Sequence, residues 1–563
     1  MNASIKKLAA FAALAGICAC SAPSGTTSNS ALPSTPSTHR VSERGRGILS
    51  TIVGVGDSLT AGYQAGGFLG ATDYRNPLDK KEFARPGQEN GWWADLDEMA
   101  SGLPEATAIA REYDPATSPL PLVKGPGLNN LLVPTPPGSL APFGLSKSGN
   151  TCTANSGFNA AGYLLNGLPT VRLNPTSTLI RDVAVPGITA HEAVTIAQPQ
   201  NNTCTPIPGI PGLLAAVVDG EASTFWPVLG TFAGMHSNLT EVRAATSLHP
   251  TLATVWLGAN DVLKYMGSGG RFVGGDNSAA QTRADLLAAI QTLKYAGAKT
   301  VVLNLPDVLR SPYFMNTTIP KASACKPPSQ TYVYCVLTQP QPFGVGLFTG
   351  KMAKATIEQF AAGYHIGSPK GCKPGTVATA CGYLTLPGAL DSFQYYLGQP
   401  VSSTAGTFPN LDCTGANFTP PCVSGSGLGS YYITPQFAGK IQQLNDNVNS
   451  GIESAASYTQ SAFIDVRAIF DGILSGEPAN PYFEKAASIN PGTCCVLALG
   501  GGLVSFDGLH PSNTGYALIA YYAIKAINQR YGTRIREVDV TKAYNGTRCS
   551  NKLYCFPDVY APH

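Results

Sequence analysis

The chain has 563 residues, of which 44% are hydrophobic and only 13% are charged, and its formal net charge is +3. This composition indicates a globular protein with a large core and excludes a wholly disordered chain. The small net charge, with no run of Lys and Arg, argues against a nucleic-acid partner. The 61 glycines and 44 prolines predict many turns and long loops.

The first residues have the pattern of a secretory signal peptide. Lys6 and Lys7 form a basic pair, and the apolar run Leu8–Ile17 that follows is too short to span a bilayer. We therefore expect residues 1–20 to be a signal and the protein to be exported, to the periplasm, to the cell surface or out of the cell.

The end of this run reads "ICAC" and resembles a bacterial lipobox. In this interpretation Cys20 is the lipidated residue, and the protein is an outer-membrane lipoprotein attached to the membrane by its lipid. Plain secretion is the alternative. Residues 21–48 are rich in Ser, Thr and Pro and are expected to form a flexible linker.

Five short apolar runs predict buried β-strands. These runs are Thr51–Val55, Ile180–Val185, Leu252–Leu257, Thr300–Leu303 and Ala462–Val466. Strands that alternate with helical patterns predict an α/β fold with a parallel sheet covered on both faces. In such sheets, binding and catalytic sites lie at the carboxyl ends of the strands.

Apolar residues at helical spacing predict three helices around these strands. Their apolar faces are Leu286, Leu287, Ile290 and Leu293 before a stop at Gly297; Phe437, Ile441, Leu444, Val448 and Ile452; and Leu518, Ile519, Tyr522 and Ile527 in a last helix at Thr514–Tyr531.

Long Gly- and Pro-rich stretches separate the predicted elements. They lie at about 64–178, 190–238, 311–430 and 475–504. We interpret them as large loop insertions in a single domain, 49–563, and not as separate domains.

The sequence has 14 cysteines, and most follow the signal. An exported chain meets an oxidising compartment, so disulfides are expected among the cysteines after Cys20. Cys325–Cys335 and Cys372–Cys381 are the expected pairs, because they close short loops. No Cys or His spacing is typical of a zinc site, so no metal is predicted.

Ser58 lies in "GDSL", directly after the first predicted strand. A serine hydroxyl is a poor nucleophile and needs a base and an acid that orients the base. In "FDGLHPSNTGY", the spacing of Asp507 and His510 lets the carboxylate reach imidazole Nδ1 and leaves Nε2 to face Ser58. A lone pair of this kind is more often part of a surface loop. His191 is a rival base, but no Asp lies near it in the sequence.

Two further strand ends carry groups that can stabilise an oxyanion. Gly187 follows the second predicted strand, and Asn260 follows the third in "WLGANDV". The N–H groups of Ser58 and Gly187 and the side-chain amide of Asn260 would supply three donors. Each residue alone is also explained by turn formation. Their order and their shared placement at strand ends favour the catalytic interpretation.

The segments "GDSLTAG", Gly187, "GAND" and "DGLH" resemble the four blocks of the GDSL, or SGNH, serine esterases and lipases. The resemblance assigns the four named positions of the family to Ser58, Gly187, Asn260 and His510, and the triad acid to Asp507. It implies a three-layer α/β/α sandwich with a parallel, five-stranded, flavodoxin-like sheet. It implies no metal and no cofactor.

The expected function is therefore that of an exported carboxylic-ester hydrolase, of lipase or acylesterase type, that acts on a small-molecule or lipid ester. A carbohydrate O-acetylesterase of the same family is the alternative within the enzymes. A non-catalytic surface binding module is the alternative from another class, although neither the serine nor the histidine has been lost.

Overall fold

The structure is a computed structural model. It describes residues 47–63, 88–122, 145–148, 151–154, 174, 177–195, 229, 239–267, 279–311, 313–316, 383–385, 432–433, 435–475, 477, 479–489, 503–504 and 509–548. Among these residues, no helix combines the length and the apolar character needed to cross a membrane.

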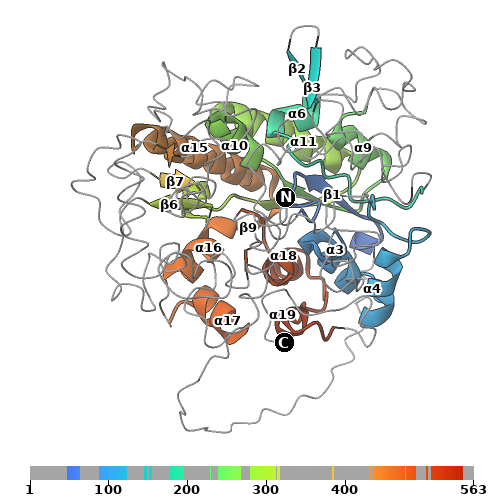
Figure 1. The fold of residues 1–563 in the computed structure, drawn as a ribbon. Coiled ribbons are helices and arrows are strands. Elements are labelled where there is room, and N and C mark those ends of the chain that lie inside the picture. The colour runs from blue at the N-terminus through green and yellow to red at the C-terminus, as the bar shows by residue number, and fades with distance from the viewer. Residues whose placement is uncertain are drawn as a thin grey trace, which may run out of the picture.

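A parallel sheet forms the centre of the described structure (Figure 1). Its strands are β1 (Ile52–Gly56), β4 (Leu252–Trp256), β5 (Lys299–Leu303) and β9 (Ala462–Ile464), in the spatial order β1-β4-β5-β9. The register pairs Ile52 with Leu252 and Leu252 with Lys299. The α/β class and four of the five predicted strands are therefore confirmed, with their ends shifted by one or two residues.

The remaining predicted strand, Ile180–Val185, lies beside β1 but forms only one bridge to it, between Gly54 and Asp182. Val183 and Val185 donate their N–H groups to the carbonyl oxygens of Gly54 and Gly56, at 3.0 and 2.8 Å. A regular parallel ladder would next use the Gly56 N–H.

That N–H group instead donates to Glu241 Oε1 at 2.7 Å. The carboxyl group of Glu241 thus interrupts the ladder at the point where the sequence alone predicts a continuous strand.

Helices lie on both sides of the sheet (Figure 1). On one side are α6 (Ala190–Thr195), α9 (Glu241–Ser247), α10 (Ala259–Gly267), α11 (Ala279–Tyr295) and α15 (Pro435–Thr459). On the other are α3 (Trp92–Ala100), α4 (Glu105–Tyr113), α16 (Val466–Ser475), α17 (Pro481–Ile489), α18 (Asn513–Tyr531) and α19 (Val540–Tyr544).

Short elements complete the described chain. They are the 3₁₀ turns η1 (Gln88–Asn90) and η4 (Val308–Arg310), the hairpin of β2 (Leu145–Ser148) and β3 (Thr151–Ala154), and the antiparallel strands β6 (Phe314–Asn316), β7 (Tyr383–Thr385) and β8 (Tyr432–Ile433).

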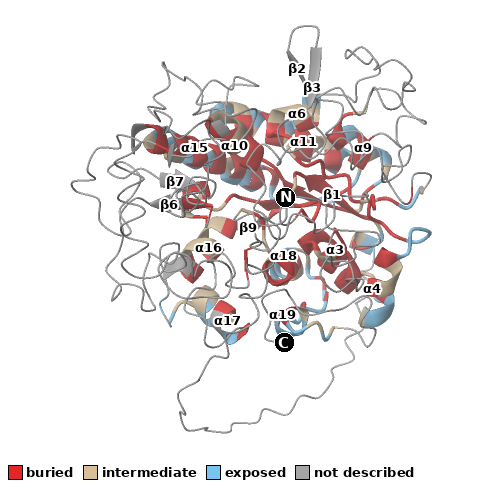
Figure 2. Cartoon of the chain, in the orientation of Figure 1, coloured by how far each residue is buried: buried red, intermediate tan, exposed pale blue. Residues whose placement is uncertain are grey.

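The core follows the sheet and the helix faces turned toward it (Figure 2). All residues of β1 and β4 are buried. Trp92 of α3 packs edge-on against Trp256 at the end of β4, with ring centroids 5.8 Å apart. Such large aromatic side chains dominate the apolar area that a core removes from water.

The predicted helix faces are largely confirmed. All five apolar residues predicted for α15 are buried, and in α11 Leu286, Ile290 and Leu293 are buried while Leu287 is partly buried. The last helix begins one residue earlier than predicted, because Ser512 accepts a hydrogen bond from the Gly515 N–H as its N-cap. It ends at Tyr531 and is followed by Gly532, whose φ of +64° suits a glycine C-cap.

Parts of the stretches expected as insertions contribute to this structure. α3 and α4 lie within 64–178, α6 lies at the start of 190–238, and α17 lies within 475–504. α3 packs against α18, so the first of these stretches supplies part of the core around the sheet.

Candidate active site

Ser58 lies in a tight turn directly after β1. The Asp57 N–H still donates to the Trp256 carbonyl oxygen of β4 at 3.3 Å, and the Ala61 and Tyr63 N–H groups donate back to the Asp57 and Ser58 carbonyl oxygens, each at 3.0 Å. The chain therefore leaves the sheet at Asp57 and turns sharply. This geometry places Ser58 at the carboxyl end of the strand, as predicted.

Gly56 lets this turn pack closely. A Cβ atom at this position would lie 2.2 Å from Thr60 Oγ1 and 2.8 Å from the Trp256 carbonyl oxygen. The Asp57 carboxylate stabilises the turn from its other side, because its Oδ1 accepts the Leu59 N–H at 2.9 Å. The packing of the turn thus explains the glycine at position 56 and the aspartate at position 57.

His510 meets Ser58 across 452 positions of sequence, with Nε2 2.9 Å from Ser58 Oγ. This is the distance at which a serine hydroxyl can donate its proton to an imidazole. His510 is 4% exposed, whereas Ser58 is only partly buried. The predicted base and the predicted nucleophile are therefore brought together, with the serine on the more open side.

Two tyrosines connect the nucleophile turn to the histidine segment. The Tyr516 hydroxyl donates to the Tyr63 carbonyl oxygen at 2.7 Å, and the Tyr63 ring lies 4.8 Å from the His510 ring, centroid to centroid. Tyr516 is in the first turn of α18, close after His510. These contacts and the capped start of α18 therefore fix the position of His510 beside Ser58.

Gly187 occupies the third position of a tight turn. The Ile188 N–H donates to the Val185 carbonyl oxygen at 3.2 Å, Pro186 is the second residue, and Gly187 has a φ of +85°. Pro followed by a glycine with positive φ is typical of a type II turn. The turn follows the segment that lies beside β1.

Asn260 lies in the first turn of α10, next to the end of β4. Gly258, with a φ of +117°, lets the chain turn from β4 into this helix. Asn260 Nδ2 donates to the Ile188 carbonyl oxygen at 3.0 Å and to Asp57 Oδ2 at 3.2 Å. Asn260 therefore joins the serine turn to the turn that contains Gly187.

The two backbone donors at the site differ from the side-chain donor. Within the described part of the chain, the N–H groups of Ser58 and Gly187 have no hydrogen-bond acceptor, whereas both N–H positions of Asn260 have one. Both residues are only partly buried, so these N–H groups are accessible to water or to a ligand oxygen. The three expected oxyanion donors thus lie on connected segments.

Several buried carboxyl groups surround the serine turn. Burial raises the pKa of Asp57 to about 7, although the hydrogen bond from Leu59 and the nearby His510 oppose this rise. Burial also raises the pKa values of Asp182 and Glu241 well above their usual range. The neighbouring charge of Asp57 adds to the rise at Glu241. The end of β1 is therefore a region where carboxyl groups resist ionisation.

No local signal in the sequence pointed to Glu241, which holds Gly56 from a position 185 residues away. Asp57 and Asp261, by contrast, stand in the motifs themselves, where turn formation is enough to explain an aspartate.

His191, the rival base, has an acidic partner that is remote in sequence. Its Nδ1 lies 3.2 Å from Asp285 Oδ1 of α11, and Gln281 Nε2 donates to the same carboxylate at 3.0 Å. The contact described for Ser58 Oγ is to His510 and not to His191. His191 thus forms a separate pair between α6 and α11.

Several predicted site residues lie outside the described residues. They are Asp507 and thirteen of the fourteen cysteines, Cys20 among them, whereas the backbone of Cys152 is described in β3. Within the described ranges, no cluster of His, Cys, Asp or Glu has the arrangement of a metal site.

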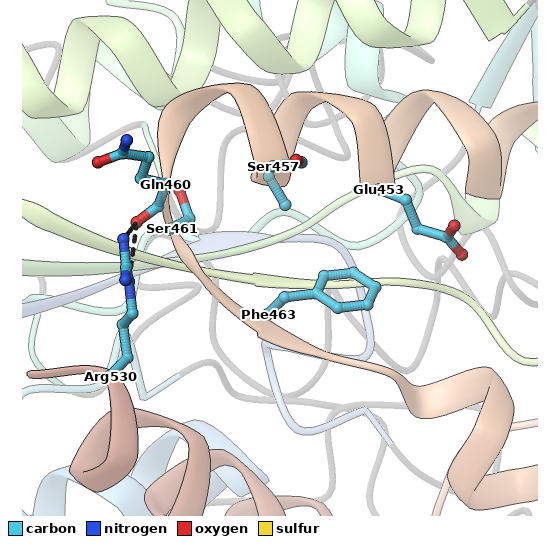
Figure 3. A pocket seen from close by; sticks show the side chains of 7 residues that line it. Glu453, Ser457, Gln460, Ser461, Phe463 and Arg530 are labelled. Carbon is cyan, nitrogen blue, oxygen red and sulfur yellow. Dashed lines mark hydrogen bonds between the residues drawn. The ribbon is translucent and has the colours of Figure 1, made fainter.

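A separate open cavity of about 480 Å³ lies beside the amino end of β9 (Figure 3). It is lined by Glu453, Ala456, Ser457, Gln460, Ser461, Phe463 and Arg530. The Arg530 guanidinium donates to the Gln460 carbonyl oxygen at 2.8 Å. Ser58 follows the carboxyl end of β1, at the other edge of the four-stranded sheet, so the cavity is not part of the serine site.

Comparisons of the chain with protein-family models, with curated proteins and with solved structures gave no match. The assignment of a function therefore depends on the residues and their geometry.

Proposed function

We propose that this protein is an exported serine carboxylic-ester hydrolase of the GDSL/SGNH type. The single observation that carries the proposal is the 2.9 Å separation of Ser58 Oγ and His510 Nε2, at the carboxyl end of β1. A serine and a histidine at this distance, from opposite ends of the chain, have the geometry of an activated nucleophile.

In the proposed reaction, Ser58 Oγ attacks the acyl carbonyl carbon and His510 Nε2 accepts the hydroxyl proton. His510 then donates this proton to the leaving alcohol as the tetrahedral intermediate collapses to an acyl-enzyme. A water molecule, deprotonated by His510, then attacks the acyl carbonyl carbon. The bond from this carbon to Ser58 Oγ breaks, His510 returns the proton to Ser58 Oγ, and the carboxylic acid leaves. In the same proposal Asp507 holds the imidazole tautomer and stabilises the imidazolium.

The carbonyl oxygen of the substrate becomes negatively charged during both attacks. The N–H groups of Ser58 and Gly187 are its proposed donors, supported by their lack of acceptors within the described residues. Asn260 is the third donor and must redirect one hydrogen from Asp57 Oδ2, the longer of its two contacts. Asn260 then keeps its hydrogen bond to Ile188 while it binds the oxyanion.

We propose further that the fold is the three-layer α/β/α sandwich of this family. The segment Ile180–Val185, bonded to Gly54 and Gly56, would be the fifth strand at the edge next to β1. The resulting spatial order, with the second segment outside β1 and then β4, β5 and β9, is the order 2-1-3-4-5 of flavodoxin-like sheets.

Export, attachment through Cys20 and the substrate belong to the same proposal and are supported by the sequence alone. The substrate is a small-molecule or lipid ester, with a carbohydrate O-acetyl ester as the alternative. No cofactor, metal or nucleic acid takes part in the proposed reaction.

A fluorophosphonate probe tests the proposal, because it reacts with a serine only when that serine is activated. We expect stoichiometric labelling of Ser58 by peptide mapping, and hydrolysis of a series of acyl esters from acetyl to palmitoyl, with acetylated sugars alongside. Absence of labelling in the folded protein would instead favour a non-catalytic binding module.

A further inference from the structure

The turn that contains Gly187 is held against α10 by two adjacent residues. Asn260 donates to the Ile188 carbonyl oxygen at 3.0 Å, and Asp261 Oδ2 accepts the Ala190 N–H at 2.9 Å. These contacts bracket the residues that directly follow Gly187. The position of the Gly187 N–H is therefore set from α10.

Helix α6, which begins at Ala190, is itself firmly capped. Thr189 Oγ1 accepts the Glu192 N–H at 3.1 Å, and Glu192 Oε2 accepts the Thr189 N–H at 2.8 Å, which together form a capping box. Lys264 of α10 donates to the Glu192 carboxylate at 2.6 Å. The turn is thus continuous with a short, capped helix that α10 holds at two points.

Asp261 has no role in the proton transfers described above. Its side chain is buried, and only 3% of the residue is exposed. Burial raises the pKa of Asp261 to about 7, opposed by the hydrogen bond from Ala190 and by Lys264. Burying a carboxyl group is unfavourable unless it forms hydrogen bonds. The hydrogen bond that Asp261 accepts from the Ala190 N–H explains why an aspartate is buried at this position.

Building on the proposed ester hydrolysis, we propose that Asp261 is a positioning residue for the oxyanion site, which fixes the Gly187 N–H by accepting the Ala190 N–H. The donor matters most when negative charge develops on the carbonyl oxygen. Loss of this hydrogen bond lets the turn shift relative to Ser58. A displacement of about 1 Å at a reacting centre can cost about 10²-fold in rate.

The test compares Asp261→Ala and Asp261→Ser with Asp261→Asn. The first two lack an oxygen that reaches Ala190, whereas Asn keeps an acceptor at nearly the same place. We expect Ala and Ser to lower kcat, counted per Ser58 titrated to completion with fluorophosphonate, by about 10- to 10²-fold with KM little changed. Asn should retain most of the activity.

Phenylboronic acid adds a readout that a purely structural role would not move, because its adduct with an activated serine carries the negative charge of the tetrahedral intermediate. Its inhibition constant should rise in parallel with the fall in kcat for Ala and Ser. Asp285→Asn is the matched control, because Asp285 also holds α6, through His191, and its contacts lie away from the turn. Its kcat should stay within about twofold of the original.

An unchanged kcat per titrated serine in both Ala and Ser would overturn the role of Asp261. A loss in Asn as large as that in Ala would also overturn it, since the hydrogen bond would then not be the cause. Failure of the unsubstituted protein to label at Ser58 is a different outcome and would overturn the proposed function itself.

Discussion

Two asparagines stand at neighbouring strand ends of the same sheet and have opposite surroundings. Asn304, after β5, donates to Asp465 Oδ1 at 2.8 Å, and its Oδ1 accepts the Arg467 N–H at 3.1 Å. Asn260, after β4, joins two turns whose backbone N–H groups, at Ser58 and Gly187, have no acceptor within the described residues.

The difference separates a structural polar cluster from a candidate catalytic one. Around Asn304 the side-chain amide has partners for both its donor and its acceptor atoms. The main-chain carbonyl oxygen of Asn304 also accepts the Trp256 indole N–H, at 3.1 Å. Around Asn260 the hydrogen bonds hold two turns whose Ser58 and Gly187 backbone N–H groups have no acceptor within the described residues. Asn304 is fully buried, whereas Ser58 and Gly187 are only partly buried, so their N–H groups remain accessible to a ligand oxygen.

The largest effect is expected from loss of the proposed nucleophile, Ser58, or the proposed base, His510. Ser58→Ala and His510→Ala should each lower kcat by about 10⁴- to 10⁶-fold, and the double variant should be little worse than either, because the two residues act as one unit. Initial rates with an acetyl ester, together with melting temperatures, measure this. Additive losses in the double variant would show that one of the two residues is outside the catalytic unit.

A direct test of the comparison replaces each asparagine in turn. Asn260→Ala should lower kcat by about 10²- to 10³-fold with little change in KM, as loss of one oxyanion donor does. Asn304→Ala should instead lower the free energy of unfolding by about 1–3 kcal/mol, because a fully buried side chain and its partly buried partners lose their hydrogen bonds.

The kcat per titrated serine should be retained in Asn304→Ala. Denaturant titrations and steady-state kinetics on the same preparations decide between the two roles. Equal behaviour of the two variants, in either measurement, would remove the distinction between the two strand ends.

The carboxyl group of Asp57, which Asn260 contacts, is buried near Ser58 and makes the stability of the chain depend on pH. Burial raises the pKa of Asp57 from an ordinary value of 3.8 to about 7, so between these values the folded chain binds more protons than the unfolded chain. The contribution of Asp57 to stability is therefore present below about pH 4 and is lost as the pH rises to about 7, by an amount on the order of a few kcal/mol.

Asp57→Asn cannot ionise, so its free energy of unfolding relative to the original chain should rise between pH 4 and pH 8. Denaturant titrations at a series of pH values measure this difference. Ile52→Val in β1 removes no titrating group and should shift stability equally at every pH. A constant difference for Asp57→Asn would show that its carboxyl group ionises in the folded chain as easily as in the unfolded one.

Local pattern was enough to predict four of the five strands, with their ends within one or two residues. The apolar run before Ser58 and the periodic face of α15 depend on neighbours in the sequence, and both are present in the structure. The motifs also placed Ser58 and Asn260 after strands and His510 before the last helix, which is where the structure has them, whereas the segment before Gly187 forms only an isolated bridge.

Contacts between remote segments could not be predicted in the same way. Glu241 takes the N–H of Gly56 and so reduces the predicted strand Ile180–Val185 to a single bridge. No local pattern at either position encodes that contact. The absence of an aspartate near His191 in the sequence was equally uninformative, because Asp285 reaches it from α11.

The smallest effect is expected at this second histidine pair. His191 resembles His510 in having a polar partner, but its described contacts join α6 to α11, and Ser58 Oγ lies against His510. The role of His191 therefore resembles that of Asn304 and not that of Asn260, because the contacts of His191 hold structural elements together.

His191→Ala should therefore keep kcat and KM within about twofold while lowering the free energy of unfolding by up to about 1 kcal/mol, as loss of a partly exposed side-chain pair does. His510→Ala, assayed with the same ester under the same conditions, provides the contrast. Steady-state kinetics and denaturant titrations measure the two effects. A loss of kcat in His191→Ala approaching that in His510→Ala would make His191 a second base and would require the proton path from Ser58 to be reassigned.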